Sequence, residues 1–319
     1  MRHLCMPFFL AVISATGGAY AVSSAEFYSS KSYQYGRFEA RMQFAPGDGV
    51  VSSFFLWKNG SEVSGTFWNE LDFEKVGSDC HLQTNAIYGN PSASNSQTPV
   101  LSSSLCDQFH TYAYEWTPDY IAWLVDGLEI RRETGDTAAA YAQNATAGMQ
   151  LRFNIWPGDA SFGGNFDPAI LPVYQYIHWI QYSSYSDSAF QLQWHQDFTA
   201  TTMPSGWLAG NWNSPKGLST DTSSNIGFMN GYAVLALTAD DAKGIAGAAP
   251  VDTADAGTMG AGGSASTADA GVTHTANGND SGCGCRVSAG HTKSNYAILL
   301  IAGLLLSVIP RCRSRFGRN

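Results

Sequence analysis

The sequence predicts an all-β protein, a sandwich or jelly roll of two antiparallel sheets. Only 13% of the 319 residues are charged, while another 13% are Phe, Trp or Tyr. Between residues 26 and 240, short segments of alternating apolar and polar residues are separated by Gly, Asn, Pro and Ser. Many short strands in succession are typical of this class.

Individual segments support this prediction. Residues 38–44, 112–116 and 121–125 alternate with the period of two expected of a half-buried strand. The pair Asp126-Gly127 follows the third segment and predicts a hairpin turn. Only residues 137–147 are Ala-rich enough to suggest a short helix.

Composition also limits the ligand. A net charge of −9 argues against nucleic acid and against a polyanionic polysaccharide, because both demand Lys and Arg. Aromatic rings offer flat apolar faces with polar edges, which match sugar rings. We therefore expect a neutral polysaccharide as partner and no nucleic acid.

The N-terminal residues 1–21 read as a secretory signal peptide. Arg2 and His3 precede an apolar run over 4–13, and Ala19-Tyr20-Ala21 supplies the small-residue cleavage pattern. The alternative is a buried first helix. Export would permit disulfides, and Cys80 and Cys106 are then the plausible pair within the folded region.

The C-terminal end divides into two parts. Residues 242–281 consist mostly of Ala, Gly, Ser, Thr and Asp, which predicts a flexible linker. Residues 282–319 combine a Gly-Cys-Gly-Cys motif, an apolar stretch over 296–309 and several arginines. This order resembles the sorting tail of myxobacterial surface proteins. The resemblance implies processing by a protease near Cys283 or Cys285 and retention at the cell surface.

Two other interpretations of this tail remain open. The apolar stretch is shorter than the roughly 20 residues that a membrane span needs, which leaves only a marginal anchor. A Cys-x-Cys metal site would need further ligands, and no His or Cys partner is suitably spaced.

The strongest chemical signal is the segment 68–74, which contains Glu70, Asp72 and Glu74. On a strand, acids at i, i+2 and i+4 share one face, while Leu71 and Phe73 point to the other. Leaning side chains would bring the outer carboxyls to roughly 5–6 Å, the separation of retaining glycosidases. The alternative is an acidic strand on a solvated face, where adjacent like charges would only repel.

This segment resembles the E-x-D-x-E motif of glycoside hydrolase family 16. Further similarity covers most of the folded region, at 35–42, 51–55, 109–112, 115–118, 125–127 and 151–156. The resemblance implies a concanavalin-like β-jelly roll with Glu70 as nucleophile, Glu74 as acid/base and Asp72 as helper. The unbulged motif points to the lichenase and xyloglucan-active branches.

The order of the segments resembles a circularly permuted member of that family. The aromatic-rich part from Trp194 to Leu237, which in most members precedes the segment at 35–42, here follows the catalytic half. Permutation costs little when termini lie close together at the surface. We therefore expect one hydrolase domain over 22–241, acting as a monomer.

The resemblance also implies which residues contact the substrate. Trp57, Trp68 and Trp156 are candidates for stacking on sugar rings, and each could equally be core. Phe162 stands near a position where the permuted lichenase has Trp, which puts the mixed-linkage preference in doubt. The hydrogen-bonding candidates are Gln83, Asn85, Arg152 and Asn154, of which Asn85 and Arg152 could also be purely structural.

The chemistry requires no cofactor. Many relatives have a calcium site, and His178 stands where some of them carry an Asp, so the presence of a structural calcium ion is left open. His110 is expected to support the fold.

Together these features predict a secreted retaining endo-hydrolase of β-1,3-1,4-glucan or a related neutral β-glucan. The alternatives are a glucan transglycosylase with the same strand chemistry and a carbohydrate-binding surface protein without turnover. A purely structural coat protein would leave the three acids unexplained.

Overall fold

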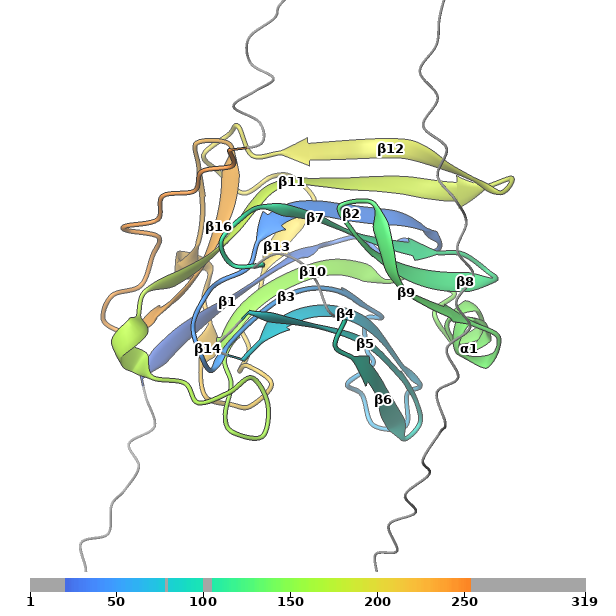
Figure 1. Cartoon of the computed structure of the whole chain (residues 1–319), viewed down its shortest axis with the longest axis horizontal. Helices are drawn as coiled ribbons and strands as arrows, with labels where there is room; N and C mark the ends of the chain where they lie inside the picture. Colours follow the sequence, from blue (N-terminus) through green and yellow to red (C-terminus); the bar gives the residue numbers. More distant parts are fainter. Residues whose placement is uncertain (1–20, 78–79, 100–104, 254–319) are drawn as a thin grey trace, which may run out of the picture. The chain divides into compact units, whose positions relative to one another are not determined.

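The computed structural model describes residues 21–77, 80–99 and 105–253 (Figure 1). Besides the helix α1 (Asp136–Asn144) and two 3₁₀ turns, Pro168–Ile170 and Ser223–Asn225, this part of the chain consists of strands and loops. The strands are β1 (Val22–Ser29), β2 (Gly36–Gln43), β3 (Val50–Trp57), β4 (Trp68–Val76), β5 (His81–Gly89), β6 (Ser92–Gln97), β7 (His110–Trp116), β8 (Tyr120–Val125), β9 (Leu128–Thr134), β10 (Gln150–Pro157), β11 (Val173–Ser186), β12 (Ala189–Asp197), β13 (Trp207–Ala209), β14 (Thr220–Asp221), β15 (Ile226–Met229) and β16 (Tyr232–Ala239).

The strands form two curved layers that are continuous with each other. The first layer runs in the order β6-β5-β4-β3-β10-β1, and the second continues as β16-β11-β2-β7-β8-β9 (Figure 1). β12 lies outside this order and pairs with β11. The pairings between the described strands are antiparallel, except that β1 and β14 run parallel. The predicted all-β, jelly-roll-like fold is confirmed.

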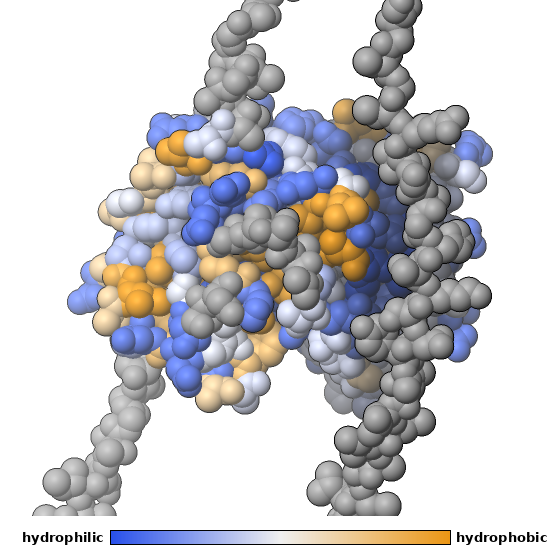
Figure 2. All heavy atoms as spheres, in the orientation of Figure 1, coloured by the Kyte–Doolittle hydropathy of each residue, from blue (hydrophilic) through white to orange (hydrophobic). Residues whose placement is uncertain are grey.

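The core lies between the layers and follows directly from the alternation in the sequence. In β2, for example, Phe38, Ala40 and Met42 are fully buried, whereas the residues between them are partly exposed. β4 contributes Leu71 and Phe73 to the same cluster. On the face drawn in Figure 2, hydrophilic residues surround scattered apolar groups.

Two local predictions are confirmed. Asp126 and Gly127 both adopt positive φ (50° and 79°) between β8 and β9, as a tight hairpin turn requires. The Ala-rich segment forms α1, which ends a few residues before the expected boundary.

Cys80 and Cys106 form a disulfide with a Cα–Cα distance of 6.0 Å. The bridge attaches the turn before β5 to the segment before β7, and Cys106 Sγ contacts the Ala45 carbonyl. It therefore ties the start of β5 in the first layer to the segment that leads into β7 of the second layer.

The linker prediction is wrong for the residues just after 241. The Asp252 carboxylate lies 2.5 Å from Arg41 Nε, and its main-chain N–H donates to Tyr232 Oη at 3.1 Å. Ala248 is buried against an aromatic cluster that includes Phe109. We call residues 245–252 the C-terminal strap. Small residues make this segment look featureless in sequence, yet they let it lie close against the second layer.

The other predicted terminal segments lie outside the described residues: 1–20 of the signal peptide, 254–281 of the linker, and the tail 282–319. Within the described ranges, no helix is long and apolar enough to cross a membrane.

Candidate active site

The structure places Glu70, Asp72 and Glu74, which we call the acid triad, on the face of β4 that points away from the core. Leu71 and Phe73 between them are fully buried in the core. Glu70 and Glu74 are half-buried, and Asp72 is only 3% exposed. The alternation of the sequence thus gathers three carboxyls on one surface, as predicted.

Strand pairing brings the predicted polar contacts beside the acid triad. Across from it on β5, Asn85 pairs with Asp72 and Gln83 pairs with Glu74. On the other side, Trp57 of β3 pairs with Glu70. We call this surface of β1, β3, β4, β5 and β10 the site face.

The next strand, β10, adds Arg152 and Asn154 to the site face. Asn154 Oδ1 accepts a 2.5 Å hydrogen bond from Ser53 Oγ, which joins β10 to β3. Arg152 forms a 2.7 Å ion pair with Glu26 of β1. All four predicted hydrogen-bonding residues therefore lie on one surface with the acid triad.

Trp68 and Trp57 form the aromatic border at the Glu70 end. The indole Nε1–H of Trp68 donates to Glu70 Oε2 at 2.8 Å. The two indole rings meet edge to face at 4.9 Å, which restricts the orientation of both. Trp68 thus contacts the Glu70 carboxylate directly. The sequence predicted only that Trp68 stacks on a sugar ring, and not this hydrogen bond.

Trp156 and Phe162 lie at the opposite end. Their rings stack at 5.9 Å, and Trp156 is only 4% exposed although it is on the site-face side of β10. A cavity of about 270 Å³ lies at the end of β10 and is lined by Pro157, Gly158, Asp159, Ala160, Asn165, Phe166 and Leu218. Phe162 therefore covers one face of Trp156.

Burial raises the pKa of every carboxyl in the acid triad. It raises the pKa of Glu70 to about 7, against the opposing effects of the Trp68 hydrogen bond and the Arg152 charge. Burial, and then the charge of Glu70, raises the pKa of Glu74 to about 8. Burial, and then both glutamates, holds the pKa of Asp72 well above its usual range. Glu74 therefore keeps a proton at a pH where Glu70 is already losing one.

Sequence reasoning missed Glu26, Tyr28 and Trp212. Glu26 is buried beside Arg152 and also accepts from Trp212 Nε1 at 3.2 Å. The Arg152 guanidinium lies over the Tyr28 ring at 4.7 Å. Glu26 stands alone between two apolar residues, and its partner Arg152 is 126 positions away. Glu26 and Tyr28 come beside Arg152 only through the register that pairs β1 with β10.

His110 and His178 both contact residues that support the fold. His110 Nδ1 lies 2.6 Å from Asp126 Oδ2 at the β8–β9 turn, as a fold-supporting role requires. His178 stacks on Tyr232 and lies 3.5 Å from the strap residue Asp252. Among the residues that the structure describes, no group of three or more His, Cys, Asp or Glu is arranged to hold a metal.

Comparison with known proteins places this site in a family. The profile of glycosyl hydrolases family 16 matches residues 13–181. A protein named Beta-glucanase from Fibrobacter succinogenes is 37% identical over 76% of this chain and 71% of its own length. A Beta-glucanase from Brevibacillus brevis is 31% identical over 54% of this chain and 65% of its own.

A solved structure is also similar to part of the chain. The Bacillus licheniformis β-glucanase shares 27% identity over 50% of this chain and 77% of its own, with a TM-score of 0.42. The acid triad and all five strands of the site face lie inside the matched range 13–181. The chain belongs to glycosyl hydrolases family 16.

Proposed function

We propose that this protein is a retaining endo-β-glucanase that hydrolyses β-1,3-1,4-glucan or a closely related neutral β-glucan. The observation that carries the proposal is the acid triad, in which Glu70 and Glu74 share one face of β4 and differ in proton affinity in the order the reaction needs. The relatives named Beta-glucanase support the substrate class.

The reaction has two displacements. In the first, a Glu70 carboxylate oxygen bonds to the anomeric carbon while the glycosidic C–O bond breaks, and the Glu74 carboxyl protonates the departing oxygen. In the second, Glu74 takes a proton from water as the water oxygen bonds to the anomeric carbon and the Glu70 ester bond breaks. Both carboxyls return to their starting state.

The surroundings fit these roles. The Trp68 N–H and the Arg152 charge favour the ionised form of Glu70, as a nucleophile requires. The high pKa of Glu74 keeps it protonated for the first step. Asp72 lies between them with its pKa well above its usual range, so in its protonated form it adds no negative charge.

The first test compares products from barley mixed-linkage glucan, laminarin and xyloglucan, with anomers followed by NMR. Short oligosaccharides from mixed-linkage glucan, first formed as β-anomers, are expected. First products in the α-configuration would refute the retaining mechanism. Products longer than the starting chains would indicate a transglycosylase instead.

A second test separates cutting from binding. Glu70→Ala should still bind glucan in an affinity gel but release no product, because the covalent step is lost. Unchanged cutting would overturn the assignment of Glu70. Binding by the unaltered protein without cutting of any glucan would favour a carbohydrate-binding protein.

The order of segments supports a circular permutation. β13, β14 and β16, which come late in the chain, all pair with β1 at its beginning. Joining the two ends would therefore connect adjacent strands. Moving residues 187–240 in front of residue 22 should give a folded protein with unchanged products, and failure to fold would contradict the permutation.

We further propose export through the signal peptide 1–21 and retention at the cell surface after a protease processes the tail near Cys283 or Cys285. Immunoblots of cell-surface and medium fractions test this. Replacing both cysteines with serine should leave an unprocessed chain. Identical processing in that variant would contradict the role of the motif.

A further inference from the structure

Three aromatic side chains reach the main chain of β4 from inside the core. The carbonyls of the consecutive residues 70, 71 and 72 each accept a hydrogen bond from one of them. The bonds run from Tyr141 Oη to Glu70 O (2.5 Å), from Tyr114 Oη to Leu71 O (3.0 Å), and from Trp123 Nε1 to Asp72 O (3.1 Å).

The three donors come from separate elements, α1, β7 and β8, and each is fully buried. Both tyrosines also reach a neighbouring strand. Tyr141 Oη lies 3.0 Å from Ile87 O on β5, and Tyr114 Oη lies 2.8 Å from Phe54 O on β3. Since a carbonyl oxygen has two lone pairs, it can accept such a bond in addition to one within the sheet. Each hydroxyl has one proton, so its hydrogen bond is shared between a carbonyl of β4 and one of a neighbouring strand, β5 for Tyr141 and β3 for Tyr114.

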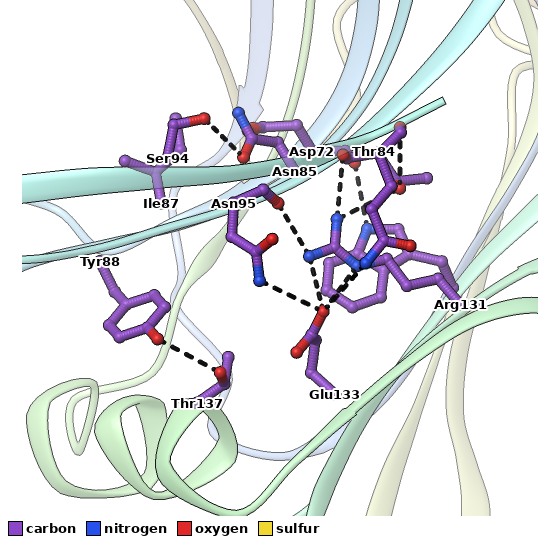
Figure 3. Close-up of polar contacts among 12 residues, drawn as sticks. Asp72, Thr84, Asn85, Ile87, Tyr88, Ser94, Asn95, Arg131, Glu133 and Thr137 are labelled. Atoms are coloured by element: carbon purple, nitrogen blue, oxygen red, sulfur yellow. Dashed lines mark hydrogen bonds and ion pairs between the residues drawn. The ribbon is translucent and has the colours of Figure 1, made fainter. Parts of the chain in front are cut away.

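The donors are themselves held in place. The Arg131 guanidinium lies 4.4 Å from the Trp123 ring and donates to Thr84 O at 2.9 Å and Asn95 O at 2.8 Å (Figure 3). On the helix that carries Tyr141, Thr137 Oγ1 lies 3.2 Å from Tyr88 Oη (Figure 3). These contacts hold the Trp123 ring and the first turn of the helix that carries Tyr141.

The direction of the acid triad depends on this main chain. The side chains of Glu70 and Asp72 leave β4 on the site face, opposite to the donors, so a tilt of the peptide groups moves both carboxyls. A misplacement of about 1 Å can cost about 100-fold in rate. Ladder hydrogen bonds lie in the plane of the sheet, and the three donors add contacts from beneath it.

We propose that Tyr141, Tyr114 and Trp123 are positioning residues, which set the placement of Glu70 and Asp72 by hydrogen-bonding their strand from the core. This inference rests on the proposed function. It concerns how the reaction is supported and adds no group that touches the substrate.

Tyr112 provides a matched comparison within the same core. It lies on β7 two residues before Tyr114, is fully buried, and packs 5.4 Å from the Phe73 ring of β4. Its hydroxyl has no hydrogen-bond partner within the described part of the chain. A buried tyrosine against β4 can thus pack without bonding to it.

The experiment compares Tyr141→Phe and Tyr114→Phe with Tyr112→Phe, measuring kcat, KM and Tm on the substrate that the unaltered protein cuts fastest. Each change removes one oxygen and keeps the ring. We expect kcat to fall about 10- to 100-fold in the first two, with KM within twofold. Tyr112→Phe should leave kcat and KM unchanged, because no bond to β4 is lost.

A kcat for Tyr141→Phe and Tyr114→Phe within twofold of the unaltered protein would overturn the proposal. So would an equal loss in Tyr112→Phe, since the effect would then be one of packing. If either variant fails to fold, Trp123→Phe removes the indole N–H while keeping an aromatic ring, with the same expected split between kcat and KM. An unaltered protein inactive on every glucan would instead refute the proposed function.

Discussion

Carboxylates lie on both outer surfaces of this molecule, but their surroundings differ. On the second layer, Glu39 and Glu115 flank Arg37 at 2.9 and 2.6 Å, and Arg37 and Glu115 are direct partners in the β2–β7 register. We call this surface the paired face. On the site face, three acids are neighbours on one strand, and burial raises the pKa of each.

The difference separates two uses of charge. Opposite charges across a strand pair stabilise it modestly, whereas like charges side by side destabilise it. An arrangement that costs stability persists where it serves another purpose. The following predictions compare an acid of the acid triad with an acid or base of the paired face.

The largest expected effect is on turnover. Glu74→Gln should lower kcat/KM by about 10²- to 10⁴-fold, because the amide cannot protonate the leaving oxygen. The matched variant Glu39→Gln, the same change on the paired face, should stay within twofold. Initial rates of oligosaccharide release measure both. Equal losses would erase the functional distinction between the two faces.

The second effect is on pH dependence. Activity should fall about tenfold per pH unit below about 7 as Glu70 takes up a proton, and should also fall above about 8 as Glu74 loses its proton. A profile of kcat/KM from pH 4 to 10 measures both limbs. Glu39→Gln should keep the same profile. A flat rate down to pH 4 would contradict the raised pKa of Glu70.

The third effect is on stability. Burial raises the pKa of Glu74 from 4.5 to about 8, so the folded state binds more protons than the unfolded state between these values. This contribution is fully present below pH 4.5 and is lost as pH rises through 8. Glu74→Gln changes the free energy of unfolding at each pH. This change should be more stabilising at pH 9 than at pH 4, by about 1–3 kcal/mol.

Urea unfolding at the two pH values measures this difference. Glu39→Gln, the same change on the paired face, serves as the control. A Glu74→Gln variant that is equally destabilised at both values would show that its carboxyl does not titrate with folding.

The smallest effect concerns the paired face alone. Arg37→Ala removes two partly exposed ion pairs and should lower the free energy of unfolding by about 0.5–1 kcal/mol, with kcat unchanged. Thermal unfolding and initial rates measure the two quantities. A tenfold loss of kcat would show that the faces are coupled through the core.

Much of the site was predictable because it is local in sequence. Glu70, Asp72 and Glu74 reach one face through the two-residue period of a single strand, and no tertiary information is needed for that. The Trp68 bond to Glu70 has the same origin but was not predicted, because aromatic residues near sugars suggest stacking before hydrogen bonding.

Other features depend on contacts between distant segments. The Glu26–Arg152 pair requires the β1–β10 register, and Tyr141 is an unremarkable residue of a short helix until that helix is packed behind β4. The strap was misjudged for a related reason. Composition measures how much apolar surface a segment can bury by itself, and says nothing of an ion pair such as Asp252 with Arg41.

The strap also has a mechanical consequence. A pull on the chain beyond Thr253 is first resisted by the Asp252–Arg41 ion pair and the contacts of the strap with Tyr232. Arg41 belongs to β2 and Tyr232 belongs to β16, so the load enters the second layer. β4 is three strands from β1 in the first layer and carries none of it directly. Tension on the C-terminal end would thus be absorbed at a point remote from the acid triad.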